Sequence, residues 1–234
     1  MKNEGFFVSS VFLLCHDKLI KIQNETVSVL SSILKNKIVA IIRGAAPKDV
    51  ISIVEALFEG GILLVEITLN SEKAFELIRD CSGLMQNKML IGAGTVLDVE
   101  SAKKAIDNGA QFVISPGFNM QVMGFVKKQT GLVSIPGAFT PTEIIAAHKA
   151  GADIVKVFPA LSVQYIKDLR GPLSHIPLMP TGGIDLGNIK EFQKTGAVAF
   201  GIGTALVNAN QQITKASLKE ITQKSLQFVQ AVSA

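Results

Sequence analysis

The sequence predicts an α/β fold, a closed (β/α)8 TIM barrel, on the strength of three observations. First, eight short apolar, β-branched runs recur from about Lys37 onward. Second, these runs begin about 20–26 residues apart, which is the length of a strand plus a crossover helix. Third, the runs are apolar on both faces, as expected for strands buried between a barrel interior and a layer of helices.

The runs give the order of the elements. The predicted strands are Lys37–Arg43, Leu63–Leu69, Met89–Thr95, Phe112–Gly117, Leu132–Ala138, Ile154–Ala160, Pro177–Gly183 and Ala197–Gly203. The segments between them are predicted to be helices, most clearly Asp49–Phe58, Ser101–Ile106 and Pro141–Ala150, and a long helix from about Ile213 to Val232 closes the chain. An open doubly wound sheet is the alternative. The even spacing, and the lack of a GxGxxG motif after the first strand, favour the closed barrel.

Composition limits the class of partner. The chain has 234 residues, of which 48% are hydrophobic and 18% charged, and this suits one core-rich barrel domain. The net charge is +4, but Lys and Arg are spread along the chain without a dense basic run. There is no Trp and only one Tyr to stack on bases. We therefore expect an enzyme that captures anionic small molecules, with no nucleic-acid partner.

The cysteines and histidines do not predict a metal site. Cys15 and Cys81 lie far apart, and His16, His148 and His175 have no ligand spacing. We expect free thiols in a reducing cytoplasm, and neither a metal nor another cofactor.

The first 24 residues are predicted to be an extension outside the barrel domain, which we place at residues 25–234. Phe6–Cys15 is apolar and follows Lys2, but no A-x-A cleavage site follows it. The run is too short to span a bilayer, so we expect no membrane partner. An extra helix, an oligomer contact and a start codon placed too early all remain open, and we favour a segment without a catalytic role.

Two charged residues interrupt the apolar strands. Lys156 lies within IVKVFPA and Glu66 within LLVEITL. Burial disfavours the ammonium form, so the pKa of Lys156 should fall toward neutrality, as a Schiff-base nucleophile requires. Burial raises the pKa of Glu66 while a nearby lysine lowers it, which suits a proton shuttle. A structural ion pair between the two is the alternative interpretation.

Polar and glycine-rich strand ends predict anion sites. In such barrels the chemistry lies at the C-terminal ends of the strands, and phosphate is often held after strands seven and eight. These ends carry PTGGI at 180–184 and GIGTA at 201–205, with the hydroxyls of Thr181 and Thr204 as further donors. Arg43 and Thr95 end the first and third strands and could hold a carboxylate. Tight barrel turns and a surface ion pair of Arg43 are the structural alternatives.

Taken together, these motifs resemble the class I aldolases that act on 2-keto-3-deoxy-6-phosphogluconate (KDPG) and 4-hydroxy-2-oxoglutarate (KHG). The matching segments are EITL, IGAGTVL, ISPG, IPGAFTPTE, VKVFPA, PTGGI and GIGT, in order from about Lys37 to the C-terminus. The resemblance implies a (β/α)8 barrel, commonly a homotrimer, that needs no metal. It implies cleavage of KDPG to pyruvate and glyceraldehyde 3-phosphate, as in the Entner–Doudoroff pathway, and of KHG to pyruvate and glyoxylate.

The resemblance also implies roles for individual residues. Lys156 would form the Schiff base and Glu66 would be the general acid/base. Thr95 would bind the pyruvyl carboxylate. Pocket residues would be Pro116 and Phe158, and the phosphate would be held by Gly182, Gly183, Gly203 and Thr204 together with Thr181.

One position departs from this pattern. Many members carry an arginine four residues after the glutamate, and this chain has Asn70 there. We therefore assign the carboxylate to Arg43. Asn70–Ser71 resembles relatives that act on the galactonate epimer, whereas PTGGI resembles the gluconate type, so both substrates stay open. Other open alternatives are a phosphate-binding barrel isomerase or synthase without a Schiff base, and a non-catalytic binding protein.

Overall fold

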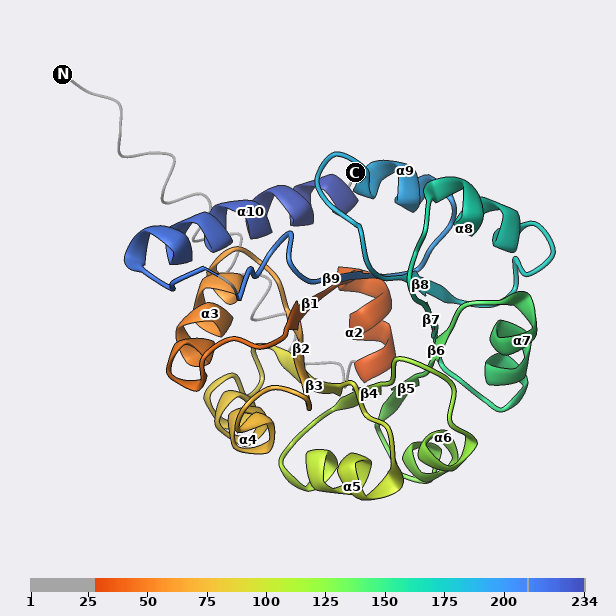
Figure 1. Cartoon of the computed structure of the whole chain (residues 1–234), viewed down its shortest axis with the longest axis horizontal. Coiled ribbons are helices and arrows are strands. Elements are labelled where there is room, and N and C mark those ends of the chain that lie inside the picture. The colour runs from red at the N-terminus through yellow and green to blue at the C-terminus, as the bar shows by residue number, and fades with distance from the viewer. Residues whose placement is uncertain (1–27, 210, 234) are drawn as a thin grey trace.

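The computed structural model describes residues 28–209 and 211–233. From β1 (Ile38–Ile42) onward, strands and helices alternate except at one divided strand, and the strands form a ring with these helices outside it (Figure 1). The expected barrel fold is confirmed. The predicted extension, residues 1–24, lies outside the described residues, as do Cys15 and His16.

Each predicted strand is present. The strands are β1 (Ile38–Ile42), β2 (Leu64–Thr68), β3 (Leu90–Gly94), β4 (Phe112–Ile114), β5 (Val133–Ile135), β6 (Gly137–Ala138), β7 (Val155–Val157), β8 (Leu178–Pro180) and β9 (Phe200–Ile202). The helices are α2 (Val29–Asn36), α3 (Pro47–Glu59), α4 (Ala74–Leu84), α5 (Val99–Asp107), α6 (Met120–Lys127), α7 (Pro141–Lys149), α8 (Val163–Arg170), α9 (Ile189–Lys194) and α10 (Lys215–Ser233).

The predicted fifth strand is divided into β5 and β6 at Pro136. Proline has no N–H to donate to a neighbouring strand, so regular pairing stops at that residue. Its carbonyl still accepts the N–H of Lys156 at 2.9 Å. The interruption therefore leaves β6 aligned with β7.

The strands close into one ring. They pair in parallel in the orders β5-β4-β3-β2-β1-β9 and β6-β7-β8. A parallel bridge between Thr181 and Gly201 joins the ends of β8 and β9. A Cβ on Gly201 would lie 2.4 Å from Thr181 Oγ1, so the close approach at this seam depends on glycine. Since β5 continues into β6, the two sheets form a single barrel.

Buried apolar residues form two layers. One cluster fills the barrel interior and includes Val39, Leu64, Phe112, Ile154 and Met179. The other lies between strands and helices and includes Val65, Ile67, Val155 and Val157. Successive strand residues alternate between the two layers, which explains why the sequence runs are apolar on both faces.

Helix α2 closes the N-terminal end of the barrel. Its Ile33 is fully buried within the interior cluster, and Figure 1 shows the helix across the ring of strands. The Ser28 side chain accepts the N–H of Ser31 at the start of the helix. Only Lys37, in the left-handed conformation, separates α2 from β1. The opposite, C-terminal mouth is therefore the open end.

The last helix begins slightly later than predicted. Helix α10 starts at Lys215 rather than near Ile213, because Thr214 Oγ1 accepts the N–H of Ser217 at 3.2 Å and so caps the helix. Across residues 28–209 and 211–233, none of the helices is both long and apolar enough to cross a membrane.

Candidate active site

Glu66 lies on β2 with its side chain inside the barrel. It follows Leu64 of the interior cluster by two residues, so both side chains are on the same face of the strand. The side chain is fully buried, and neither carboxyl oxygen has a hydrogen-bond partner among the described residues. Because buried polar groups are normally hydrogen-bonded, these oxygens are suited to a bound reactant.

The surroundings of Glu66 favour its protonated form. Burial raises the pKa of this carboxyl above its usual range, and the positive charges of Lys156 and Arg43 offset part of that effect. A carboxyl poised in this way can give up a proton and take it back as charge nearby changes.

Gly94 of β3 provides the space for the Glu66 side chain. A Cβ at Gly94 would lie 1.7 Å from Glu66 Oε1 and 2.3 Å from Glu66 Cδ. Sequence reasoning missed this residue. A glycine one position before Thr95 could equally end a strand, and only the neighbouring side chain shows what it does.

Lys156 lies on β7 and also points into the barrel. It follows Ile154 of the interior cluster by two residues and is 3% exposed. It pairs in register with Gly137 of β6 and Met179 of β8. Among the described residues, no ion pair joins the Lys156 ammonium to the Glu66 carboxyl. The arrangement therefore differs from a structural salt bridge, although the two charges interact.

Arg43 and Thr95 meet at the C-terminal mouth. Arg43 Nη2 donates to Thr95 Oγ1 at 3.3 Å, and the two residues directly follow β1 and β3. Arg43 is exposed, yet its charge acts on the buried Glu66. A guanidinium has five N–H donors, so this contact leaves others to hold a carboxylate.

Phe158 lies between the lysine and the glycine-rich loop. Its ring centroid is 5.4 Å from Lys156 Nζ, and a Cβ on Gly182 would lie 3.4 Å from the ring. The side chain is 41% exposed, so it lines the mouth rather than the core. The Phe158–Pro159 peptide bond is cis.

Pro116 lies against β6, the strand next to the one that carries Lys156. Its carbonyl oxygen would lie 2.2 Å from a Cβ on Gly137, the residue paired with Lys156. Pro116 therefore lies beside the strand neighbour of Lys156, and its role in the pocket stays a prediction.

The loop after β8 is shaped by two glycines. Gly182 and Gly183 have φ values of +93° and +72°, a region that side-chain-bearing residues avoid. Asn188 Nδ2 donates to the carbonyl of Gly183 at 2.8 Å and holds the loop. Within the described chain, no backbone carbonyl accepts the N–H group of Gly183 or of Thr204. Such donors at neighbouring strand ends suit a phosphate.

The remaining predicted residues lie in the same region. Gly203 follows β9, and its carbonyl accepts the N–H groups of Leu206 and Val207, both at 2.9 Å. This turn leaves Thr204 exposed. Thr181 is 3% exposed and its hydroxyl donates to the carbonyl of Met179 at 3.4 Å, so it lies in the barrel wall.

The two described histidines lie on helix α7 and in the segment before β8. His148 on α7 and His175 before β8 make an edge-on ring contact with centroids 5.5 Å apart. No group of three or more His, Cys, Asp or Glu side chains that could hold a metal ion occurs in the part of the chain that the structure describes.

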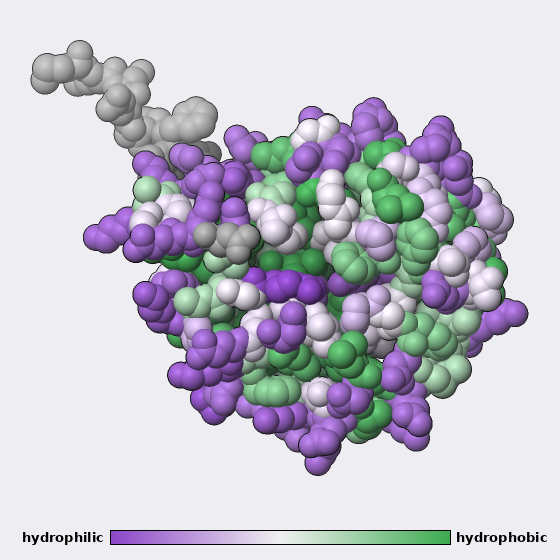
Figure 2. All heavy atoms as spheres, viewed as in Figure 1, coloured by the Kyte–Doolittle hydropathy of each residue, from purple (hydrophilic) through white to green (hydrophobic). Residues whose placement is uncertain are grey.

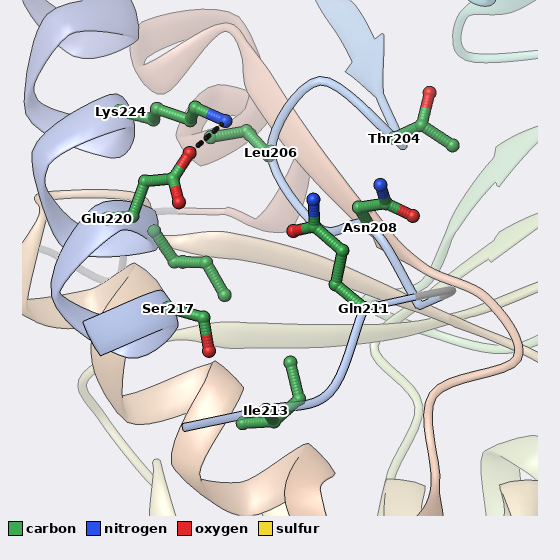
Figure 3. A pocket seen from close by; sticks show the side chains of 9 residues that line it. Thr204, Leu206, Asn208, Gln211, Ile213, Ser217, Glu220 and Lys224 are labelled. Atoms are coloured by element: carbon green, nitrogen blue, oxygen red, sulfur yellow. Dashed lines mark ion pairs between the residues drawn. The ribbon is translucent and has the colours of Figure 1, made fainter. Parts of the chain in front are cut away.

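A pocket that shares Thr204 with the glycine-rich strand ends lies between the loop after β9 and helix α10 (Figure 3). Its lining includes Thr204, Asn208 and Gln211, and the Lys224 ammonium there pairs with the Glu220 carboxylate at 2.7 Å. The lining contains neither Lys156 nor Glu66. The face shown in Figure 2 carries mixed hydrophobic and hydrophilic side chains with hydrophilic atoms near its centre.

These features define a class of protein. A buried amine and a buried carboxyl lie inside one barrel, with an arginine and exposed backbone N–H donors at its mouth. Such a set can attack a carbonyl, move protons and hold anionic groups at the same time. This set of functional groups defines a (β/α)8-barrel enzyme that acts on an anionic carbonyl compound.

Comparison with known proteins identifies the family. Residues 29–224 match the family model for KDPG and KHG aldolase. The 2-dehydro-3-deoxy-phosphogluconate aldolase of Treponema pallidum is 32% identical over 88% of this chain and 98% of its own. The 2-dehydro-3-deoxy-6-phosphogalactonate aldolase of Escherichia coli is 34% identical over 84% of this chain and 95% of its own. A solved "Native KDPGal structure" superposes with a TM-score of 0.77 at 32% identity, covering 84% of this chain and 94% of that one. The chain belongs to the KDPG and KHG aldolase family and is an aldolase, a lyase.

Proposed function

We propose that the enzyme cleaves KDPG to pyruvate and glyceraldehyde 3-phosphate through a Schiff base on Lys156, with KHG as a further donor. The observation that carries this proposal is that Lys156 and Glu66 are buried within one barrel, and that the Glu66 carboxyl has no hydrogen-bond partner among the described residues. A buried amine is a suitable nucleophile, and a carboxyl that no described residue engages is suited to exchange protons with the reactant.

The proposed cycle uses each group in turn. The free amine of Lys156 attacks the C2 ketone, and Glu66 relays protons as the carbinolamine loses water to become an iminium. The iminium accepts the electron pair of the C3–C4 bond as that bond breaks, and the aldehyde leaves. The enamine that remains takes up a proton, and hydrolysis releases pyruvate and the free lysine.

We assign the two ends of the substrate to the two anion sites. Arg43 and Thr95 hold the carboxylate beside Glu66, as their 3.3 Å contact supports. The phosphate binds at Gly182, Gly183, Gly203 and Thr204, with Thr181 in the wall behind them. Phe158 and Pro116 line the space between.

A second candidate substrate is the galactonate epimer. Asn70–Ser71 in place of an arginine at position 70 favours it, and one of the relatives above is named for that activity. We also propose a homotrimer in the cytoplasm. The homotrimer should have about three times the chain mass of 24.9 kDa in light scattering, and a chain-sized mass would refute it.

A substrate panel tests the proposal. Pyruvate release is measured with KDPG, its galactonate epimer and KHG, for wild type and for Lys156→Ala. We expect the highest kcat/KM with KDPG and loss of all three activities in the variant. A higher kcat/KM with the epimer would mean that the epimer, and not KDPG, is the preferred substrate. Undiminished cleavage by Lys156→Ala would refute the Schiff base.

A further inference from the structure

The loop that carries Arg43 is tied to the β2–α4 connection through the hydroxyl of Ser71. The Gly44 N–H donates to Ser71 Oγ at 2.9 Å, and Ser71 Oγ lies 3.0 Å from Thr68 Oγ1. The Ser71 N–H also donates to the carbonyl of Thr68 at 3.0 Å. Thr68 is fully buried at the end of β2. Ser71 is thus anchored twice to one strand and holds the backbone that follows another.

This tie acts on the peptide group next to Arg43. The Gly44 N–H belongs to the planar unit that links Arg43 to Gly44, so a bond to it fixes the orientation of that unit. Gly44 has a φ of +68°, and a Cβ placed there would meet no atom within 4 Å. The described residues therefore leave open space where a Gly44 side chain would lie, and the hydrogen bond to Ser71 restrains the turn.

We propose that Ser71 is a positioning residue for the substrate carboxylate. By holding the Gly44 N–H, it keeps the Arg43 guanidinium beside Thr95. The inference rests on the proposed function, which assigns Arg43 to the carboxylate. Position 70 lacks an arginine in this chain, and Ser71, the next residue, orients Arg43 at the end of another strand.

The test compares Ser71→Ala with Ser71→Thr. Losing the hydroxyl removes one hydrogen bond, and we expect KM for KDPG to rise about five- to tenfold while kcat stays within about twofold. Ser71→Thr keeps a hydroxyl and should restore a KM close to that of wild type. A wild-type KM in Ser71→Ala would overturn the inference.

A double-mutant cycle separates positioning from general loosening. In an Arg43→Ala background, Ser71→Ala should raise KM no further, because the group it orients is already gone. An equal rise in both backgrounds, or an unchanged KM in Arg43→Ala alone, contradicts the proposal. If wild type itself neither cleaves KDPG nor forms a pyruvate adduct, the proposed function fails. If wild type does both and Ser71→Ala matches it, only the role of Ser71 fails.

Discussion

The carboxyl of Glu66 shows how a single residue can be costly for folding and useful for chemistry. It is fully buried without a hydrogen-bond partner in the described chain, and burial outweighs the two nearby positive charges in setting its pKa. A buried polar group left unpaired destabilises the folded state. The same lack of a partner leaves both oxygens available to a reactant.

The burial of the Glu66 carboxyl predicts that Glu66→Gln changes the free energy of unfolding in a pH-dependent way. The pKa of Glu66 is raised in the folded state, so the stability it contributes is present below its unfolded pKa and is lost as pH rises through the folded pKa. Glutamine does not titrate. The unfolding free energy of Glu66→Gln relative to wild type should therefore rise with pH between those two values, by up to about 1.4 kcal/mol per pH unit.

Urea unfolding of both proteins across pH 4–9 measures this difference. The variant should also lose about 10²–10⁴ in kcat, because proton transfer is removed. A stability difference that falls with pH would mean that the carboxyl is stabilised as its anion. Glu66 would then be part of a structural ion pair.

Strand β3 places a glycine where the chemistry needs space. Gly94 lies beside Glu66, and any side chain there would overlap the carboxyl. Gly94 is the last residue of β3, where a residue with a side chain could end the strand equally well. The position is therefore better explained by the neighbouring side chain than by the strand itself.

Gly94→Ala tests this at the level of the element. Its Cβ would lie 1.7 Å from Glu66 Oε1, so the carboxyl must move and kcat should fall at least about tenfold, since a small displacement of a catalytic group is costly. The matched control is Gly124→Ala on α6, where a Cβ meets nothing within 4 Å. It should keep full activity and gain about 0.5–1 kcal/mol of stability. Equal activity in the two variants would show that Gly94 does not position Glu66.

For the molecule as a whole, the barrel could be predicted well and the geometry of the site only in part. Burial on both faces makes each strand an apolar run, so the strands are visible in the sequence. That same burial hides which face a strand residue occupies. The direction of Lys156 into the interior therefore became visible only from the fold, in which Ile154, two residues earlier on β7, belongs to the interior cluster.

Long-range contacts explain what sequence reasoning missed. Helix α2 closes the barrel through Ile33, whose burial depends on strands far along the chain. Ser71 is one of many loop serines until its hydroxyl is seen to accept the Gly44 N–H. The split of one strand at Pro136 follows from local chemistry, since the missing N–H could be inferred from the residue type.

The central claim, that Lys156 forms a Schiff base with the 2-keto acid, can be tested by reductive trapping. The protein is incubated with pyruvate and borohydride, digested, and mapped by mass spectrometry beside a Lys156→Ala control. We predict a reduced pyruvyl adduct on the peptide that contains Lys156, and none in the variant. Absence of an adduct, or an adduct on a different lysine, would contradict the account.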